Sequence, residues 1–166
     1  SSAVAIWLLI GVGMIVIQVL LGGITRLTGS GLSITEWKPI LGAIPPMNDE
    51  AWQKAFDQYK QIGQYKHLNF DFTLGDFKFI YFWEWAHRLL GRLTGLAYAL
   101  PLGWFWLRKR IPAGFKRRFM GLLALGALQG VAGWWMVASG LSERPEVSHF
   151  RLAVHLLLAL TILGGL

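Results

Sequence analysis

Residues 3–23 form an apolar run without a charged side chain, long enough for one helix to cross a lipid bilayer. Three further apolar stretches follow, at about residues 74–106, 119–139 and 148–166. Because lipid offers no hydrogen-bond partners, the backbone of a spanning segment must pair within itself, which favours helices. The sequence therefore predicts an all-α integral membrane protein built as a four-helix transmembrane bundle.

The composition agrees with a membrane protein rather than a soluble one. Hydrophobic residues make up 54% of the chain and charged residues only 15%, whereas soluble domains carry about 25% charged residues. The net charge of +7 comes from clusters at the predicted helix ends and in the loops, so no nucleic-acid partner is expected. The chain has no cysteine, which excludes disulfides, zinc–thiolate sites and covalently attached c-type haem.

The connecting segments predict how the spans are oriented. Residues 108–118, RKRIPAGFKRR, contain basic side chains and no acidic one, whereas the long loop 24–73 mixes both signs. The positive-inside rule places the basic loop on the cytoplasmic or matrix side. The long loop and the short loop 140–147 then lie on the outer side, and the second and fourth spans run in the same direction.

The long outer loop is predicted to carry a short amphipathic helix. Asn48 suits the N-cap position, with Asp49 and Glu50 in the first turn. Apolar residues then recur at helical spacing in one stripe, formed by Trp52, Ala55, Phe56 and Tyr59. Such a helix either lies on the outer membrane surface or packs on the protein itself, and the pattern allows both.

The segment 82–92, FWEWAHRLLGR, places four ionisable side chains inside the second apolar stretch: Glu84, His87, Arg88 and Arg92. A charged side chain at the centre of a membrane helix costs about 2.5–3.5 kcal/mol, so such residues are kept where they find partners. Glu84, His87 and Arg88 share one helix face, because residues three and four apart are neighbours. A histidine between a carboxylate and arginines predicts a site for an anionic cofactor.

Two of the four histidines are predicted to form a pair. His87 lies about three turns into the second span and His155 about two turns into the fourth, so both imidazoles are expected at similar depth in the outer half of the membrane. Two inward histidines from different helices can take both axial positions of a haem iron. Either one alone is more often a core residue with a hydrogen bond. His67 and His149 are expected at the surface and at the membrane interface.

The arginines fit an anionic ligand such as haem. Arginine binds carboxylates bidentately and stays charged, which suits the two haem propionates. Arg26, just past the first span, and Arg151, one turn before His155, are candidates for holding propionates. Snorkelling to the membrane interface is the alternative for both. Arg88 and Arg92 are candidates for lining the site, and Arg88 can instead pair with Glu84 across one helical turn.

Small residues recur beside the predicted site, at Gly91 and Gly95 on the second span and at Gly126, Gly130 and Gly133 on the third. Glycines let membrane helices approach closely, and they equally leave room for a flat macrocycle. The pattern by itself is weak evidence for haem.

Three motifs together resemble the haem A synthase family, more narrowly its alphaproteobacterial and mitochondrial branch. They are GGITRLTGSGLSITEW after the first span, the run from Glu84 to Arg88 with its following Gly-Arg, and RLAVH at Arg151–His155. The resemblance implies eight transmembrane helices in two four-helix halves. This chain, whose last apolar stretch has no polar flank, would be the N-terminal half, residues 1–166, with the C-terminal half absent from it.

The resemblance also implies a reaction and roles for residues. The family oxidises the C8 methyl of haem O to a formyl group, which makes haem A for cytochrome oxidase. This half would hold the substrate haem between His87 and His155, with Glu84 assisting the oxidation, and haem B is expected in the other half. A carboxylate fixed in a low-dielectric site can stabilise developing positive charge and accept protons.

The expected partners follow from the same resemblance. They are haem O, haem O synthase, cytochrome oxidase assembly factors, an electron donor of unknown identity and membrane lipid; homo-oligomerisation stays open. A bacterial plasma membrane is favoured, with the mitochondrial inner membrane as the alternative. Two rival functions remain, a bis-histidine cytochrome b that only transfers electrons and an assembly scaffold without haem.

Overall fold

The computed structural model describes residues 2–112, 114–141 and 145–166, and within these ranges it contains helices and no strands. Four long helices account for most of the chain: α1 (Ser2–Leu27), α4 (Leu74–Leu107), α5 (Phe115–Ala138) and α6 (His149–Gly165). The segment between α1 and α4 holds three short elements: η1 (Leu41–Ala43), α2 (Asp49–Tyr59) and α3 (Gly63–His67). The prediction of an all-helical fold is confirmed for the described residues.

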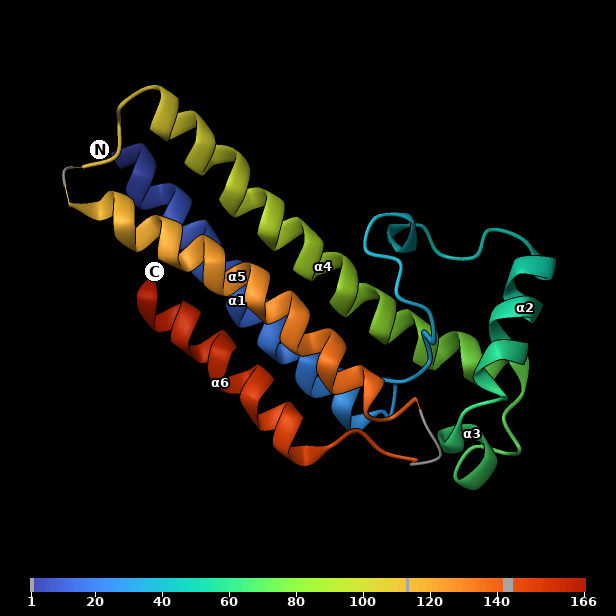
Figure 1. Ribbon diagram of the computed structural model, residues 1–166. Coiled ribbons are helices and arrows are strands. Elements are labelled where there is room, and N and C mark those ends of the chain that lie inside the picture. The colour runs from blue at the N-terminus through green and yellow to red at the C-terminus, as the bar shows by residue number, and fades with distance from the viewer. Residues whose placement is uncertain (1, 113, 142–144) are drawn as a thin grey trace.

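The long helices form an up-and-down bundle (Figure 1). The most extensive contacts join α1 to α4 and α5 to α6, and smaller contacts join α4 to α5 and α1 to α6. Each helix therefore packs on two antiparallel neighbours, and α4 and α6 occupy opposite corners of the bundle. Residues 28–73 gather at one end of the bundle, here called the large-loop end, and residues 108–114 connect α4 to α5 at the basic-loop end.

The four long helices lie at the four apolar stretches of the sequence, with small differences at their ends. α1 continues to Leu27, past the predicted end at residue 23, and the hydroxyls of Thr25 and Thr28 donate to backbone carbonyls one turn earlier. α5 begins at Phe115, because the basic residues 116–118 form its first turn instead of staying in the loop.

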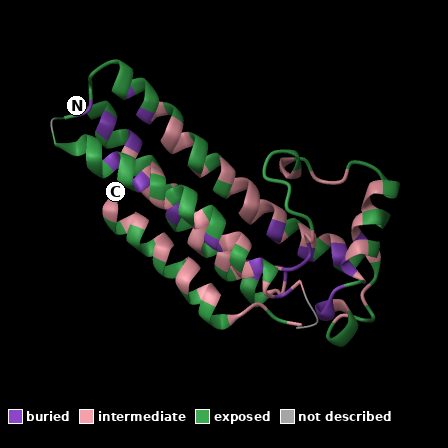
Figure 2. Cartoon of the chain, in the orientation of Figure 1, coloured by how far each residue is buried: buried purple, intermediate pink, exposed green. Residues whose placement is uncertain are grey.

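Two helices, α1 and α5, are long and apolar enough to cross a membrane. Much of both helices is exposed, as the green segments of the cartoon show (Figure 2), and the exposed residues include apolar ones such as Leu128 and Val131 of α5. Leu9 and Leu20 of α1 are 67% and 63% exposed. α6, with 17 residues, is shorter, and α4, with 34 residues, is longer than one bilayer crossing requires. Membrane spanning by α4 and α6 is therefore part of the proposal below.

The buried apolar residues form two clusters at opposite ends of the bundle. At the basic-loop end, Trp7 of α1 packs its ring against Tyr98, Phe105 and Phe119. The cluster at the large-loop end comprises Leu32, Phe56, Tyr59, Ile62, Phe77, Ile80 and Val137. The predicted ligand residues of α4 and α6 lie between these clusters.

Helix α2 forms where the sequence predicts it, and its apolar face packs on α4. Asn48 is its N-cap and accepts a hydrogen bond from the backbone nitrogen of Ala51. The ring of Phe56 stacks on Phe77 with 5.0 Å between centroids, and Tyr59 is fully buried beside them. A capping box formed by Thr73 and Asp76 begins α4. The stripe on α2 is thus covered by protein contacts.

Alkaline pH is expected to loosen the packing of α2 on α4. Burial raises the pKa of Tyr59 to about 12, although Asn69, which donates to its hydroxyl, opposes the rise. Above the ordinary tyrosine pKa of about 10, the unfolded chain releases this proton while the folded protein keeps it. Stability should therefore fall by roughly 2 kcal/mol between pH 10 and 12. Unfolding followed against pH tests this, and Tyr59→Phe should lose less stability over that range than the wild type.

Candidate functional site

Glu84 of α4 is buried, with 2% of its surface exposed, and all of its partners donate to it. Its Oε2 accepts from the Ser33 hydroxyl at 2.7 Å and from the Ile34 backbone nitrogen at 2.8 Å. Its Oε1 accepts from Arg88 Nη2 at 2.5 Å. The carboxylate therefore holds the segment that follows α1 against α4, and the Arg88 guanidinium balances its charge.

The two arginines of α4 hold the same segment by its backbone. Arg88 Nη2 also donates to the Ile34 carbonyl at 3.1 Å. One turn further, Arg92 donates to the carbonyls of Pro39 at 2.6 Å and Lys38 at 3.1 Å. The predicted pairing of Glu84 with Arg88 is confirmed. Both arginines bind the loop, and Arg92 has one buried nitrogen, Nη1, without a hydrogen-bond partner in the part of the chain that the structure describes.

His87 of α4 faces α1. The side-chain nitrogen Nε2 of Gln18 donates to the backbone carbonyl of His87 at 2.9 Å. One turn along α1, a Cβ added at Gly22 would lie 3.3 Å from His87 Nε2. A larger residue at Gly22 would therefore crowd the nitrogen that a metal ligand uses.

His155 of α6 faces α5 in the same way. Gln129 Nε2 donates to the backbone carbonyl of His155 at 3.0 Å. A Cβ added at Gly133 would lie 3.0 Å from Cε1 of the imidazole, which is tighter than side chains tolerate without a shift. His155 Nδ1 is buried and has no hydrogen-bond partner among the described residues, so this ring has a nitrogen free for a ligand or an unseen donor.

The two imidazoles lie at one level of the bundle. A Cβ added at Gly11 of α1 would lie 3.5 Å from the Leu166 side chain, so these positions face each other. α1 and α6 run antiparallel (Figure 1). Gly22 lies as many residues after Gly11 as His155 lies before Leu166, so Gly22 and His155 are at the same height in the bundle. Gly22 also contacts His87. The register therefore places both His87 and His155 at the level of Gly22.

The remaining predicted residues lie nearer the surface. Arg26 is exposed in the last turn of α1. Arg151 donates to the Trp135 carbonyl at 2.8 Å, and its guanidinium lies 4.5 Å from the centroid of the Trp135 ring. His67 and His149 are exposed, in agreement with their predicted surface positions. The roles of Arg26 and Arg151 at propionates stay predictions.

Only part of the glycine pattern marks close packing. A Cβ added at Gly95, Gly126 or Gly130 would meet no atom of the described residues within 4 Å, whereas one added at Gly91 would lie near Gln18 and one added at Gly133 near His155. Gly22, which faces His87, was not among the glycines singled out from the sequence.

Sequence reasoning also missed Gln18, Gln129 and Ser33. A signal for the glutamines is present, since each is followed four residues later by the glycine beside a histidine. One helical turn separates such positions, which places them on one helix face. Ser33 carries no comparable signal, because its contact with Glu84 joins residues far apart in the sequence.

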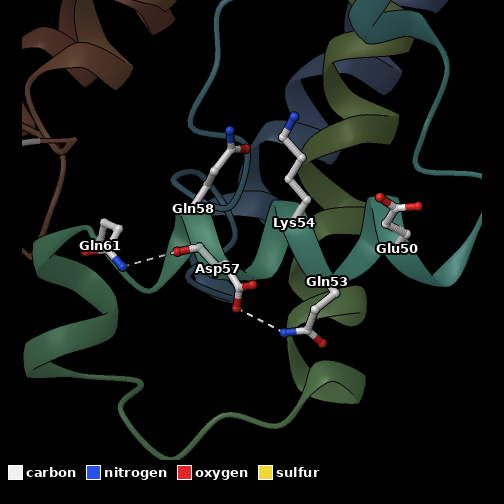
Figure 3. A pocket seen from close by; sticks show the side chains of 6 residues that line it. All are labelled: Glu50, Gln53, Lys54, Asp57, Gln58 and Gln61. Atoms are coloured by element: carbon white, nitrogen blue, oxygen red, sulfur yellow. Dashed lines mark hydrogen bonds between the residues drawn. The ribbon is translucent and has the colours of Figure 1, made fainter.

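A shallow surface pocket lies away from these residues, on the polar face of α2 (Figure 3). It is lined by Glu50, Gln53, Lys54, Asp57, Gln58 and Gln61. Gln53 donates to Asp57 at 3.0 Å, so the polar groups partly satisfy each other. Within the described residues no three histidine or acidic side chains gather as a metal site.

The residues of the bundle interior fit a haem held by two histidines. Such a haem needs one imidazole nitrogen on each of its two faces. His87 and His155 lie at one level on opposite corners, each packed against a glycine, and His155 has a buried nitrogen without a partner among the described residues. Haem ligation by these residues stays a prediction.

Comparison with known proteins identifies the family. A family model described as cytochrome oxidase assembly protein matches residues 5–166. A haem A synthase of Novosphingobium aromaticivorans is 57% identical to this chain. The match covers 100% of this chain and 48% of that protein. One of Beijerinckia indica is 61% identical over 96% of this chain and 44% of its own length.

The chain spans about half the length of the curated relatives it matches, and the matched part is their N-terminal half. No solved structure gives a significant match. The resemblance to haem A synthases predicted from the motifs is thus confirmed. Because the family match extends over nearly the whole chain, this protein belongs to the family of cytochrome oxidase assembly proteins.

Proposed function

We propose that this chain is the substrate half of a haem A synthase, in which haem O binds between α4 and α6 and its C8 methyl is oxidised to a formyl group. The observation that carries the proposal is the placement of His87 and His155 at one level on opposite corners of the bundle. The relatives named haem A synthase support the choice of reaction. Oxygen gas or water supplies the formyl oxygen, and an oxidant from outside this chain takes up the electrons removed from the methyl carbon. Haem B in the other half and a separate electron donor complete the proposal.

All four long helices cross the membrane in this proposal. The basic loop, residues 108–118, lies on the cytoplasmic side of a bacterial plasma membrane, and the large-loop end lies outside. The extra length of α4 projects from the outer surface, where Phe77 packs against α2. α2 then sits on this projecting end and covers the mouth of the bundle. Haem O synthase and oxidase assembly factors are the expected partners.

In this proposal the two histidines bind the haem, and Glu84 takes part in the oxidation. His87 and His155 bind the haem iron, and haem when bound supplies the methyl group that is oxidised. Glu84, one turn before His87, stabilises positive charge that develops on the substrate and accepts protons from it. Its contacts with Ser33, Ile34 and Arg88 keep the carboxylate in a single orientation, which supports such a preorganised role.

Arg26 and Arg151 bind the two propionates at the large-loop end in this proposal. Arg26 is exposed in the last turn of α1, so its guanidinium is free to turn toward the bundle. Arg151 stands one turn before His155 and is already oriented by the Trp135 carbonyl. Arg88 and Arg92 line the site indirectly, because they hold the loop that covers it.

Extraction of haem from the complete protein tests the proposal. Wild-type protein purified in detergent should carry haem O, a hydroxylated intermediate or haem A, identified by chromatography. His87→Ala and His155→Ala should each lose this haem, because one axial ligand is removed, while His67→Ala and His149→Ala should retain it. Haem B as the only haem in wild type and variants would favour an electron-transfer cytochrome, and a colourless wild-type protein would favour a scaffold.

A further inference from the structure

Two glutamines contact the two histidines through the same kind of hydrogen bond, from a side-chain amide to a backbone carbonyl. Gln18 on α1 donates to the carbonyl of His87, and Gln129 on α5 donates to the carbonyl of His155, at 2.9 and 3.0 Å. Both bonds cross from one helix to its antiparallel neighbour. A side-chain amide that binds the backbone of a ligand residue limits both the sliding and the rotation of that helix relative to its partner.

The residue one turn after each glutamine is a glycine that packs against the imidazole of the same histidine. Gly22 and Gly133 leave the space that the imidazoles occupy, since an added Cβ would lie 3.3 and 3.0 Å from ring atoms. Each helix pair therefore presents a Gln-x-x-x-Gly unit to one histidine. The glutamine binds the backbone carbonyl of the histidine, and the glycine leaves room for the imidazole ring.

The pair α1 and α4 and the pair α5 and α6 share a second feature besides the Gln-x-x-x-Gly unit. Both α1 and α5 are followed by the sequence Ser-Gly-Leu, at Ser30–Leu32 and Ser139–Leu141. The two copies meet at the large-loop end, where a Cβ added at Gly140 would lie 2.7 Å from the side chain of Leu32. Leu32 itself is 1% exposed. The bundle therefore contains one arrangement twice, once in α1 and α4 and once in α5 and α6.

Each glutamine buries one acceptor without a partner. The Oε1 atoms of Gln18 and Gln129 are buried, and no hydrogen bond to either is present among the described residues. A buried polar atom without a partner is unfavourable. The hydrogen bond that each amide nitrogen donates to a histidine carbonyl is therefore the favourable polar contact that offsets this cost.

We propose that Gln18 and Gln129 are positioning residues that set the depth and rotation of His87 and His155, so that the haem site consists of two equivalent half-sites, one in each helix pair. The inference rests on the proposed ligation of haem by these histidines. It extends that proposal from the ligands to the residues that orient them. Neither glutamine is assigned a contact with the substrate or a part in the chemical step.

Spectroscopy of methionine variants tests the inference. Gln18→Met and Gln129→Met keep the length of the side chain and remove the donor. Each variant should shift the low-spin electron paramagnetic resonance signal of the oxidised bis-histidine haem and weaken binding of added haemin about 10–100-fold, which is the usual effect of losing a group that orients a metal ligand. Both measurements use the complete protein in detergent and do not depend on turnover.

Trp7→Phe is the matched control. Trp7 Nε1 donates to the Ala97 carbonyl at 2.9 Å, so this variant removes the same kind of bond between the same two helices, α1 and α4, away from His87. It should lower the unfolding midpoint about as much as Gln18→Met and leave the haem signal unchanged. Equal spectral shifts in both variants would reduce Gln18 to a packing residue and overturn the inference.

The outcomes also separate this inference from the function on which it rests. A bis-histidine signal that disappears in His87→Ala but is unchanged in both glutamine variants would overturn the inference and leave the haem-binding proposal standing. A wild-type protein without any bis-histidine signal, even after haemin is added, would overturn both.

Discussion

Replacing Glu84 with glutamine is expected to lower the rate of haem O oxidation by about 10²–10⁴-fold, the usual range for loss of a general base. Glutamine has nearly the same shape, but it cannot accept a proton and brings an amide toward groups that donate to the carboxylate, Ser33 and Ile34. Haem should remain bound, because the histidines are unchanged. The rate is measured by chromatography of extracted haems over time, with haem O or its hydroxylated form accumulating in the variant.

Ser33→Ala distinguishes the chemistry of Glu84 from its structural role. This variant removes one loop contact to the carboxylate and leaves the Ile34 and Arg88 contacts in place. Oxidation should fall far less than in Glu84→Gln. If both variants lose activity equally, Glu84 acts by holding the loop, and the catalytic assignment is wrong.

Replacing Arg88 with alanine is expected to lower the free energy of unfolding by about 3–5 kcal/mol, because it leaves the buried Glu84 carboxylate without its counter-charge. The two side chains are only 16% and 3% exposed. The variant also removes the donor to the Ile34 carbonyl. Unfolding in mixed detergent micelles, followed by tryptophan fluorescence, measures the change.

Lys60→Ala provides the comparison for Arg88→Ala. Lys60 pairs with Asp57 at 3.2 Å, but these side chains are 34% and 57% exposed. Water screens such a pair, so its loss should cost less than about 1 kcal/mol. A loss in Arg88→Ala as small as in Lys60→Ala would mean that water or other donors replace the guanidinium and that the pair does not stabilise the loop.

The sequence predicted the features that depend on residues close together in the chain, such as helices, helix caps and pairs within one helix. The apolar stretch without charges became α1 because helix formation there depends on residues within one turn of each other. Asn48 is an N-cap for the same reason, since a cap accepts a hydrogen bond from a backbone nitrogen three residues away. The pairing of Glu84 with Arg88 was predictable because both side chains belong to one helix.

Contacts between distant segments were not predictable in this way. Arg88 and Arg92 were expected to line a haem site, and in the structure they bind carbonyls of residues 34–39, more than fifty positions away in the sequence. Nothing in the loop composition identifies which carbonyls will face α4. The stripe on α2 was equally compatible with lipid or protein, and packing on Phe77 decided between them.

The sequence by itself determined the helical class of the protein and the positions of its four long helices, because apolar length and helical spacing act within single segments. The binding of an anionic cofactor by residues of α4 and α6 stays a prediction. Only the tertiary structure decided that α4 and α6 occupy opposite corners, that Gln18 and Gln129 hold the two histidines, and that Glu84 is bound to Ser33. Those outcomes depend on which helix faces pack together, and packing depends on the shape and charge of all four helices at once.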